Sequence, residues 1–149
     1  MDLAVILAYI GIGLMLGLAG SGSAIGVVKG GSSSVGALKK NDEAFGNYMI
    51  LSALPGTQDL YGFLGFFIMH GYVKPDMTII QGAAIFGSGI GLGIAGLISA
   101  MKQGEVCANG IAGIAGGHDV FGKTLILAVF PELYAIVAFA ATFLISNSL

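Results

Sequence analysis

The chain has 149 residues, of which 56% are hydrophobic and only 9% are charged, and it contains neither Trp nor Arg. A soluble domain of this size needs more charged side chains to cover its surface, so the composition is typical of a membrane protein. The formal net charge of −2 comes with no basic stripe, which excludes nucleic acid as an expected partner.

Four apolar segments follow one another along the chain. They cover about Leu3–Val28, Phe45–His70, Thr78–Met101 and Phe121–Ser146. Each is long enough for a helix that crosses a bilayer, which takes about 20 residues. Their hydropathy does not alternate from residue to residue, so they predict helices and not the strands of a barrel. We therefore expect an all-α membrane protein with four transmembrane helices, the first and third extending past these apolar limits and leaving only tight turns.

The lysines predict how these spans are oriented. Those between spans one and two and between spans three and four are Lys29, Lys39, Lys40, Lys102 and Lys123. Only Lys74 lies in the connection on the other side. Because cytoplasmic loops carry the excess of positive charge, we expect a multi-pass protein with both hairpin loops in the cytoplasm and both termini outside.

The second half of the chain repeats the first at an offset of 76 residues. The matches run through glycines, small residues and prolines, and include Gly11 with Gly87, Gly17 with Gly93, Ser23 with Ser99, Phe45 with Phe121 and Pro55 with Pro131. Such a run at one offset indicates a duplicated unit. We expect two helical hairpins, residues 1–73 and residues 74–149, inserted the same way round.

Glycines are concentrated in spans one and three, where they cover more than one stripe of each helix. Small residues allow helix backbones in a membrane to approach closely. Crowding on two sides favours an inner ring of helices, with spans two and four outside it. Ordinary packing within a single four-helix bundle is the alternative.

Glu132 is the one acidic residue within the fourth apolar segment. An ionised side chain at that depth costs about 3 kcal/mol, so intramembrane acids are usually functional. We interpret Glu132 as the carrier of an ion or a proton, the alternative being a protonated or hydrogen-bonded structural acid. The first repeat has Gly56 at the matching position, so only one repeat carries the acid.

Several oxygen-bearing residues are predicted at the depth of Glu132. Spacings of i, i+3, i+4 and i+7 place on one helical face Leu54, Thr57, Gln58 and Tyr61. Leu54 would contribute a backbone carbonyl freed near Pro55. Folding span three against span four brings Gln103 opposite Glu132. Hard cations select oxygen ligands, so this surplus of oxygens favours Na⁺ over a proton. Interhelical hydrogen bonding is the alternative role for these polar side chains.

Three segments, LPGTQDLYGF (54–63), KQG (102–104) and PELYAIVAF (131–139), resemble the proteolipid subunit of V-type rotary ATPases. The sodium-pumping bacterial K subunit is the nearest match. The resemblance implies a rotor ring of about ten identical subunits in a bacterial cell membrane. It also implies a stator membrane subunit that supplies an Arg, a central-stalk subunit, and contact with lipid. ATP would be hydrolysed in a separate soluble head, so the chain is not expected to be an enzyme by itself.

The resemblance also assigns roles within the predicted site. The residues that would bind Na⁺ are Leu54 through its carbonyl, Thr57, Gln58, Gln103 and Glu132. Tyr61 would donate a hydrogen bond to the carboxylate and close the site. Transport of H⁺ alone by Glu132 is the alternative.

Two residues depart from the pattern of similar proteins, which usually have Gly at the position of Asp59 and a small residue at that of Lys102. Each is a possible modulator, since it lies one position from a site residue. We hypothesise that Asp59 and Lys102 form an ion pair across spans two and three. Asp59 would otherwise be a second ion-binding carboxylate shared with Glu132, or face a wet gap between subunits.

Two other functions compete with the rotor subunit. One is an oligomeric channel or small transporter in which Glu132 acts as a gate. The other is a structural proteolipid in which Glu132 is a packing acid. The unequal repeats favour the rotor, because a pore lined by both repeats should keep both acids.

Overall fold

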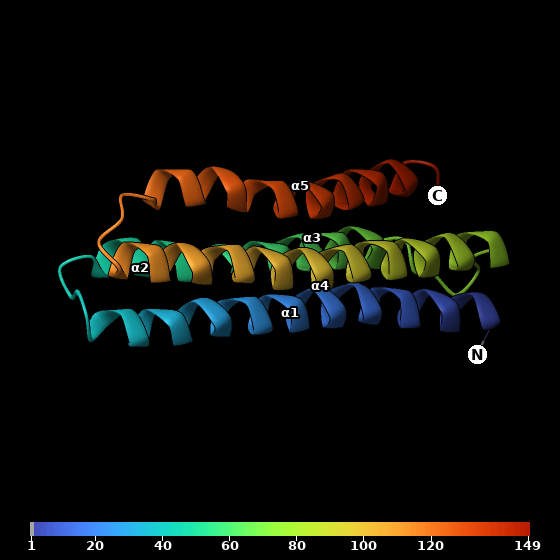
Figure 1. Cartoon of the computed structure of the whole chain (residues 1–149). Helices are drawn as coiled ribbons and strands as arrows, with labels where there is room; N and C mark the ends of the chain where they lie inside the picture. The colour runs from blue at the N-terminus through green and yellow to red at the C-terminus, as the bar shows by residue number, and fades with distance from the viewer. Residues whose placement is uncertain (1) are drawn as a thin grey trace.

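Long helices run side by side along one axis in the computed structural model, which describes residues 2–149 (Figure 1). Their bounds are α1 Leu3–Leu38, α2 Phe45–Ala53, the 3₁₀ helix η1 Leu54–Gly56, α3 Thr57–His70, α4 Ile79–Ala115 and α5 Phe121–Ser146. No strand occurs within these described residues. Both termini lie at one end of the bundle, and the α1–α2 and α4–α5 connections lie at the other. The all-α prediction is confirmed.

Helices α1 and α4 are each longer than the hydrocarbon core of a membrane is thick. Helix α1 has 36 residues and α4 has 37, which at 1.5 Å per residue gives each a length of about 54 Å. The hydrocarbon core of a bilayer is about 30 Å thick, so both helices extend beyond it, as expected. The Asp2 side chain caps α1, and Thr78 with Gln81 forms a capping box at the start of α4.

The second span is interrupted at its proline. Pro55 has no backbone N–H, so the regular helical pattern cannot continue through it, and η1 separates α2 from α3. In that turn the Leu54 carbonyl accepts from both the backbone N–H and the hydroxyl of Thr57. The expectation that this carbonyl is left free is therefore wrong. Helix α5, by contrast, continues through Pro131 as one element.

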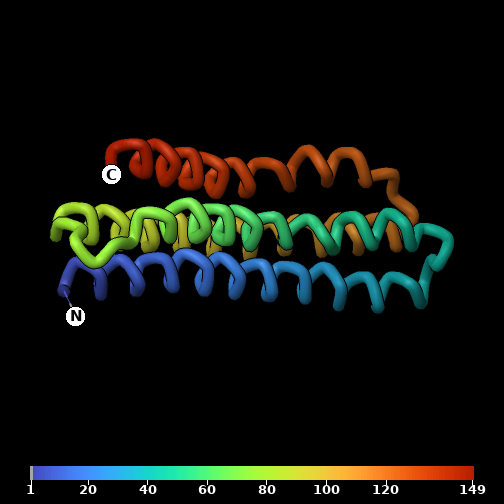
Figure 2. Tube along the Cα trace, turned by 180° about the vertical axis from the view of Figure 1, so that it is seen from behind, coloured from blue at the N-terminus to red at the C-terminus, as the bar shows by residue number. Residues whose placement is uncertain are grey.

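Glycines hold α1 and α4 close together. A methyl group added at Gly22 would lie 2.5 Å from the Cα of Leu97, and one added at Gly104 would lie 2.6 Å from the Cα of Gly26. Gly11 and Gly89 lie in the same contact at the other end of the pair. Helix α3 packs against both helices of this pair, whereas α5 packs against α4 and α3 (Figure 2).

A second set of glycines lies outside the α1–α4 contact. A methyl group added at Gly13, Gly17, Gly87 or Gly91 would meet no other atom within 4 Å. Glycines therefore lie on two sides of α1 and of α4, and on one of those sides no other part of the described chain packs against them.

Two apolar cores fill the two ends of the bundle. One includes Met15, Met69, Ile85 and Leu92. The other includes Tyr48, Leu51, Cys107, Ile111 and Ala128. The buried polar residues Gln58 on α3 and Gln103 on α4 lie between these two cores. Apolar packing therefore holds the helices in place on both sides of the candidate site.

Substitution of Gly89 by Ala should destabilise the folded chain. Its added methyl group would clash with the backbone of Gly11, and such overpacking typically costs about 1–3 kcal/mol. Gly122→Ala is the matched control, because a methyl group there meets no atom within 4 Å. Thermal unfolding of the detergent-solubilised protein should show a lower Tm for Gly89→Ala alone. Equal Tm values for the two variants would contradict the close α1–α4 packing.

Candidate ion-binding site

Glu132 receives hydrogen bonds from two different helices. The Tyr61 hydroxyl on α3 donates to Glu132 Oε1 at 3.0 Å, and Gln103 Nε2 on α4 donates to Glu132 Oε2 at 3.1 Å. Both donors are neutral groups. No lysine or histidine within residues 2–149 forms an ion pair with this carboxylate. The donors therefore orient the carboxylate without neutralising its charge.

Two fully buried glutamines connect α3 to α4 behind the carboxylate. Gln58 and Gln103 are each 0% exposed. Gln58 Nε2 donates to Gln103 Oε1 at 3.0 Å, and Gln103 Nε2 also donates to the Ala128 carbonyl at 2.9 Å. Gln103 therefore turns its amide nitrogen toward Glu132, while its oxygen keeps a second lone pair. This network fixes the separation of three helices at the depth of Glu132.

Thr57 brings further oxygens together at the start of α3. Its hydroxyl lies 3.0 Å from the Leu54 carbonyl and 3.3 Å from Gln58 Oε1, and it can donate to either. A backbone carbonyl, a hydroxyl and an amide oxygen are thus neighbours in space. The interruption at Pro55 makes this possible, because it brings the Leu54 carbonyl to the Thr57 side chain.

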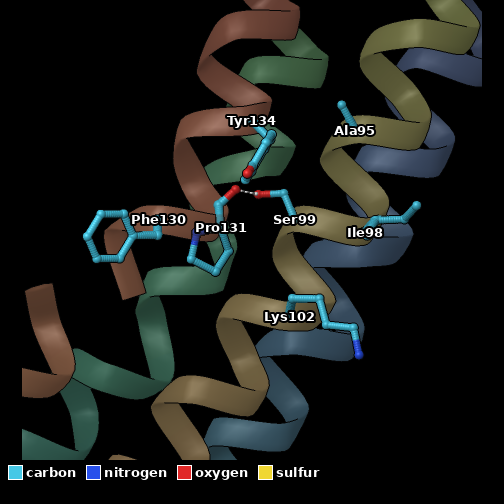
Figure 3. A pocket seen from close by; sticks show the side chains of 7 residues that line it. All are labelled: Ala95, Ile98, Ser99, Lys102, Phe130, Pro131 and Tyr134. Atoms are coloured by element: carbon cyan, nitrogen blue, oxygen red, sulfur yellow. Dashed lines mark hydrogen bonds between the residues drawn. The ribbon is translucent and has the colours of Figure 1, made fainter. Parts of the chain in front are cut away.

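Ser99 belongs to the same network, although the motif-based prediction did not include it. Its hydroxyl accepts from Gln58 Nε2 at 2.9 Å. It also donates to the Pro131 carbonyl at 2.8 Å, the bond drawn in Figure 3. The repeat held a signal for it, since Ser99 matches Ser23. Ser23 Oγ likewise meets the outer helix of its own hairpin, where it accepts from the Asp59 backbone N–H at 2.9 Å. In both hairpins this serine bonds the inner helix to the outer one.

The predicted Asp59–Lys102 ion pair is not formed within the chain. Lys102 Nζ lies 2.9 Å from Glu105 Oε2, one turn along its own helix. The Asp59 carboxylate lies over Gly20 on α1, where an added methyl group would be 2.9 Å from Asp59 Oδ1. The prediction of a pair within one chain is wrong, because the Asp59 side chain lies on the side of α3 that faces α1, whereas Gln58 lies on the side that faces α4.

Asp59 is also separate from the ion site. No hydrogen bond joins it to Glu132 in the part of the chain that the structure describes. A second pair of charges lies further along α4, where Lys29 Nζ is 2.7 Å from Glu105 Oε1. Glu105 thus has two lysine partners, whereas Asp59 and Glu132 have no cationic partner among residues 2–149.

The geometry defines what the site can hold. Tyr61, Gln103 and Glu132 meet directly, and Gln58, Thr57 and the Leu54 carbonyl are joined to them by successive hydrogen bonds. One carboxylate among neutral oxygens can be neutralised by one monovalent cation or one proton. Oxygen-only ligand sets suit hard cations.

The sequence was compared with known proteins. The family of ATP synthase C subunits matches it twice, over residues 10–69 and 86–145. A-type ATP synthase subunit K of Methanocaldococcus jannaschii is 37% identical over 131 residues, which are 88% of this chain. The chain spans only 57% of that relative's length. V-type sodium ATPase subunit K of Enterococcus hirae is 37% identical over 126 residues, 85% of this chain and 81% of the relative. The two family matches are offset by the 76 residues of the internal repeat.

Ser99→Ala should loosen the site and destabilise the chain. The substitution removes the donor to the Pro131 carbonyl and one partner of the buried Gln58 amide, and unsatisfied buried groups cost about 1–3 kcal/mol. Ser21→Ala is the control, since Ser21 is exposed and bonds only the Gly17 carbonyl of its own helix. Thermal unfolding in detergent should separate the two variants. An unchanged Tm for Ser99→Ala would argue against this network.

Proposed function

The chain belongs to the family of ATP synthase C subunits, and from this premise we propose that it is the ion-carrying rotor subunit of a V-type ATPase. It is an integral membrane proteolipid, a non-catalytic subunit of its complex. Glu132 would bind and release one cation as each subunit passes the stator. Na⁺ is the cation that we propose, because a relative at 37% identity is named as a V-type sodium ATPase subunit K.

One observation carries the proposal: Glu132 has two well-placed neutral donors and no cationic partner among the described residues. An ionised carboxylate in lipid is costly. The charge can be removed by a bound cation or proton, or compensated by a cation on another protein. A subunit that alternates between these conditions carries ions.

The proposed Na⁺ ligands are the Leu54 carbonyl, Thr57 Oγ1, Gln58 Oε1, Gln103 Oε1 and a Glu132 carboxylate oxygen. The short contacts among Leu54, Thr57 and Gln58 support this set, since three oxygens already converge there. Gln103 would join through the lone pair that Gln58 leaves open. Tyr61 would hold the other carboxylate oxygen and keep Glu132 turned inward. A proton would need none of these oxygens beyond the carboxylate.

Rotation follows from the charge of the site. With a cation bound, the carboxylate is neutral and the rotor can move it through lipid. Without it, Glu132 must face water or a stator cation, which we propose is an Arg on a neighbouring membrane subunit. Moving one elementary charge against 100 mV costs about 2.3 kcal/mol. ATP hydrolysis in a separate soluble head would supply that free energy through a central stalk.

The assembly we propose is a ring of about ten copies, a closed arrangement of head-to-tail contacts. Each copy would contribute two hairpin units, residues 1–73 and 74–149. The uncovered glycine sides of α1 and α4 support lateral contacts between copies. Lys39 and Lys40 in the α1–α2 connection and Lys123 at the start of α5 support a topology with the hairpin loops in the cytoplasm. We propose a bacterial cell membrane as the location.

Labelling by a hydrophobic carbodiimide tests the carrier role of Glu132. The reagent should modify Glu132 alone in the purified complex, and Na⁺ should protect it in proportion to site occupancy. Glu105→Gln is the matched control, because the Glu105 carboxylate is paired with two lysines and should contribute no labelling. Mass spectrometry of the modified peptides would assign the site. Labelling at Glu132 that Na⁺ does not slow would favour protons, and no labelling would contradict a carrier.

Thr57→Val should weaken Na⁺ binding while leaving the fold intact. Loss of one oxygen ligand worth about 1.4 kcal/mol raises the half-saturating Na⁺ concentration about tenfold. Thr142→Val is the control, since the Thr142 hydroxyl is buried but bonds only the Ala138 carbonyl of its own helix. ATP-driven uptake of radioactive sodium into vesicles that carry the whole complex would give both values. The same half-saturating concentration in both variants would remove Thr57 from the ligand set.

A further inference from the structure

A groove of about 490 Å³ lies between α4 and α5, on the side of the second hairpin away from the first (Figure 3). We call it the α4–α5 groove. The residues that line it are Ala95, Ile98, Ser99, Lys102, Phe130, Pro131 and Tyr134. It is mainly apolar, and Lys102 is its one charged residue. The Lys102 side chain is 61% exposed.

The internal repeat identifies what this groove corresponds to. Moving each lining residue back by 76 positions gives Ala19, Gly22, Ser23, Gly26, Leu54, Pro55 and Gln58. This is the face with which the first hairpin packs against the second. Ala19 and Gln58 are 0% exposed there, and Gly26 lies against the Ala100 backbone. The groove is therefore the repeat of a surface that another hairpin covers.

The covering surface has a repeat as well. Helix α4 packs against α1 with a stripe that includes Gly89, Gly93, Gly96 and Ala100, and the buried Gln103 follows them on the same face of α4. The matching stripe on α1 is Gly13, Gly17, Gly20, Ala24 and Val27, all of them exposed or partly exposed. One chain thus has an uncovered groove on one side and an uncovered matching stripe on the other.

The charges near these two surfaces are complementary. Glu105 is shared by Lys29 and Lys102, so this group of three carries one surplus positive charge. Asp59 carries one negative charge without a cationic partner among residues 2–149, and its carboxylate lies over Gly20, at the edge of the uncovered α1 stripe. The surplus cation borders the groove and the surplus anion borders the stripe.

We propose that the α4–α5 groove receives the first hairpin of a second copy of this chain, and that Asp59 of that copy pairs with Lys102. The inference rests on the proposed ring, and it adds which charges join neighbouring subunits. The repeat gives the expected separation of the two charges along the contact. Gly20, which lies under Asp59, matches Gly96, and Gly96 is six positions before Lys102 on α4. That is about 9 Å of rise. In the single chain Lys102 reaches toward Glu105, one turn on the C-terminal side. To meet Asp59 it would leave Glu105 to Lys29 and turn toward the N-terminus of α4, the direction in which its Cα–Cβ bond already points, which covers most of that distance.

This pairing accounts for the two departures from the family pattern together. A lone Asp59 or a lone surplus lysine in the membrane is costly, whereas the pair across the contact neutralises both. It also makes the two contacts of the ring unequal. Ile98 and Lys102 stand in the groove where Gly22 and Gly26 stand in the internal contact, so helices of neighbouring copies are further apart than α1 and α4 within one copy.

Cysteine cross-linking tests the pairing. Asp59→Cys and Lys102→Cys are introduced together in a Cys107→Ala background, and the detergent-extracted complex is treated with a short bifunctional thiol reagent. A link between copies gives a ladder of dimers and higher oligomers on a denaturing gel. The control pair is Lys29→Cys with Glu105→Cys, which lie in one chain and whose native side chains are in contact. It should give internally linked monomers and no ladder.

Native mass measurement of the same sample separates the possible failures. An intact ring that yields only monomers, whether unlinked or internally linked, overturns the pairing and leaves the proposed function standing. If neither the cysteine variant nor the unsubstituted chain forms a ring, the proposed assembly is overturned together with the pairing.

A double-mutant cycle covers the case in which the cysteine variant does not assemble. Asp59→Asn and Lys102→Gln should each lower the temperature at which the ring dissociates in detergent by several degrees. The double variant should lose less than the sum of the two single losses, because either substitution alone leaves one charge unpaired. Strictly additive losses would overturn the pairing.

Discussion

A negative charge that the chain does not neutralise, within a helix long enough to cross a membrane, is the constraint on which the rest of the molecule depends. Glu132 is held by Tyr61 and Gln103, and the two buried glutamines in turn hold α3 against α4. Hydrogen bonds from neutral groups orient a carboxylate but do not remove its charge. A cation or a proton bound at Glu132 would remove that charge, and the proposed function depends on this.

Duplication followed by divergence explains why there is one such site and not two. Both hairpins keep the serine that bonds the inner helix to the outer one, as Ser23 and Ser99 show. At the positions equivalent to Gln103 and Glu132 the first hairpin has Val27 and Gly56, and a methyl group added at Gly56 would lie 3.8 Å from Val27 Cγ2. The two hairpins thus share a backbone arrangement, but only the second has the glutamine and the carboxylate at these positions. The chain therefore has one such carboxylate for every two hairpins.

The helices could be predicted from the length of the apolar segments and from the 76-residue repeat. The contact between Gln103 and Glu132 could also be predicted, because folding two helices antiparallel about a short turn determines which residues lie opposite one another. The interruption at Pro55 could be located, but not the capture of the Leu54 carbonyl by Thr57, which depends on local 3₁₀ geometry. Ser99 was missed because its match with Ser23 in the repeat does not show which groups the hydroxyl contacts. The direction of the Asp59 side chain could not be predicted either, because span two packs against both α1 and α4 and the sequence does not show which of the two Asp59 faces.

Ion binding by isothermal titration calorimetry tests the central claim most directly. Rings of the native chain and of Glu132→Gln would be titrated with Na⁺ in a buffer free of other alkali cations. The account predicts one Na⁺ bound per chain in the native ring and none in the Glu132→Gln ring. Equal binding by both rings would show that the cation is held elsewhere, and would contradict the role given to this carboxylate.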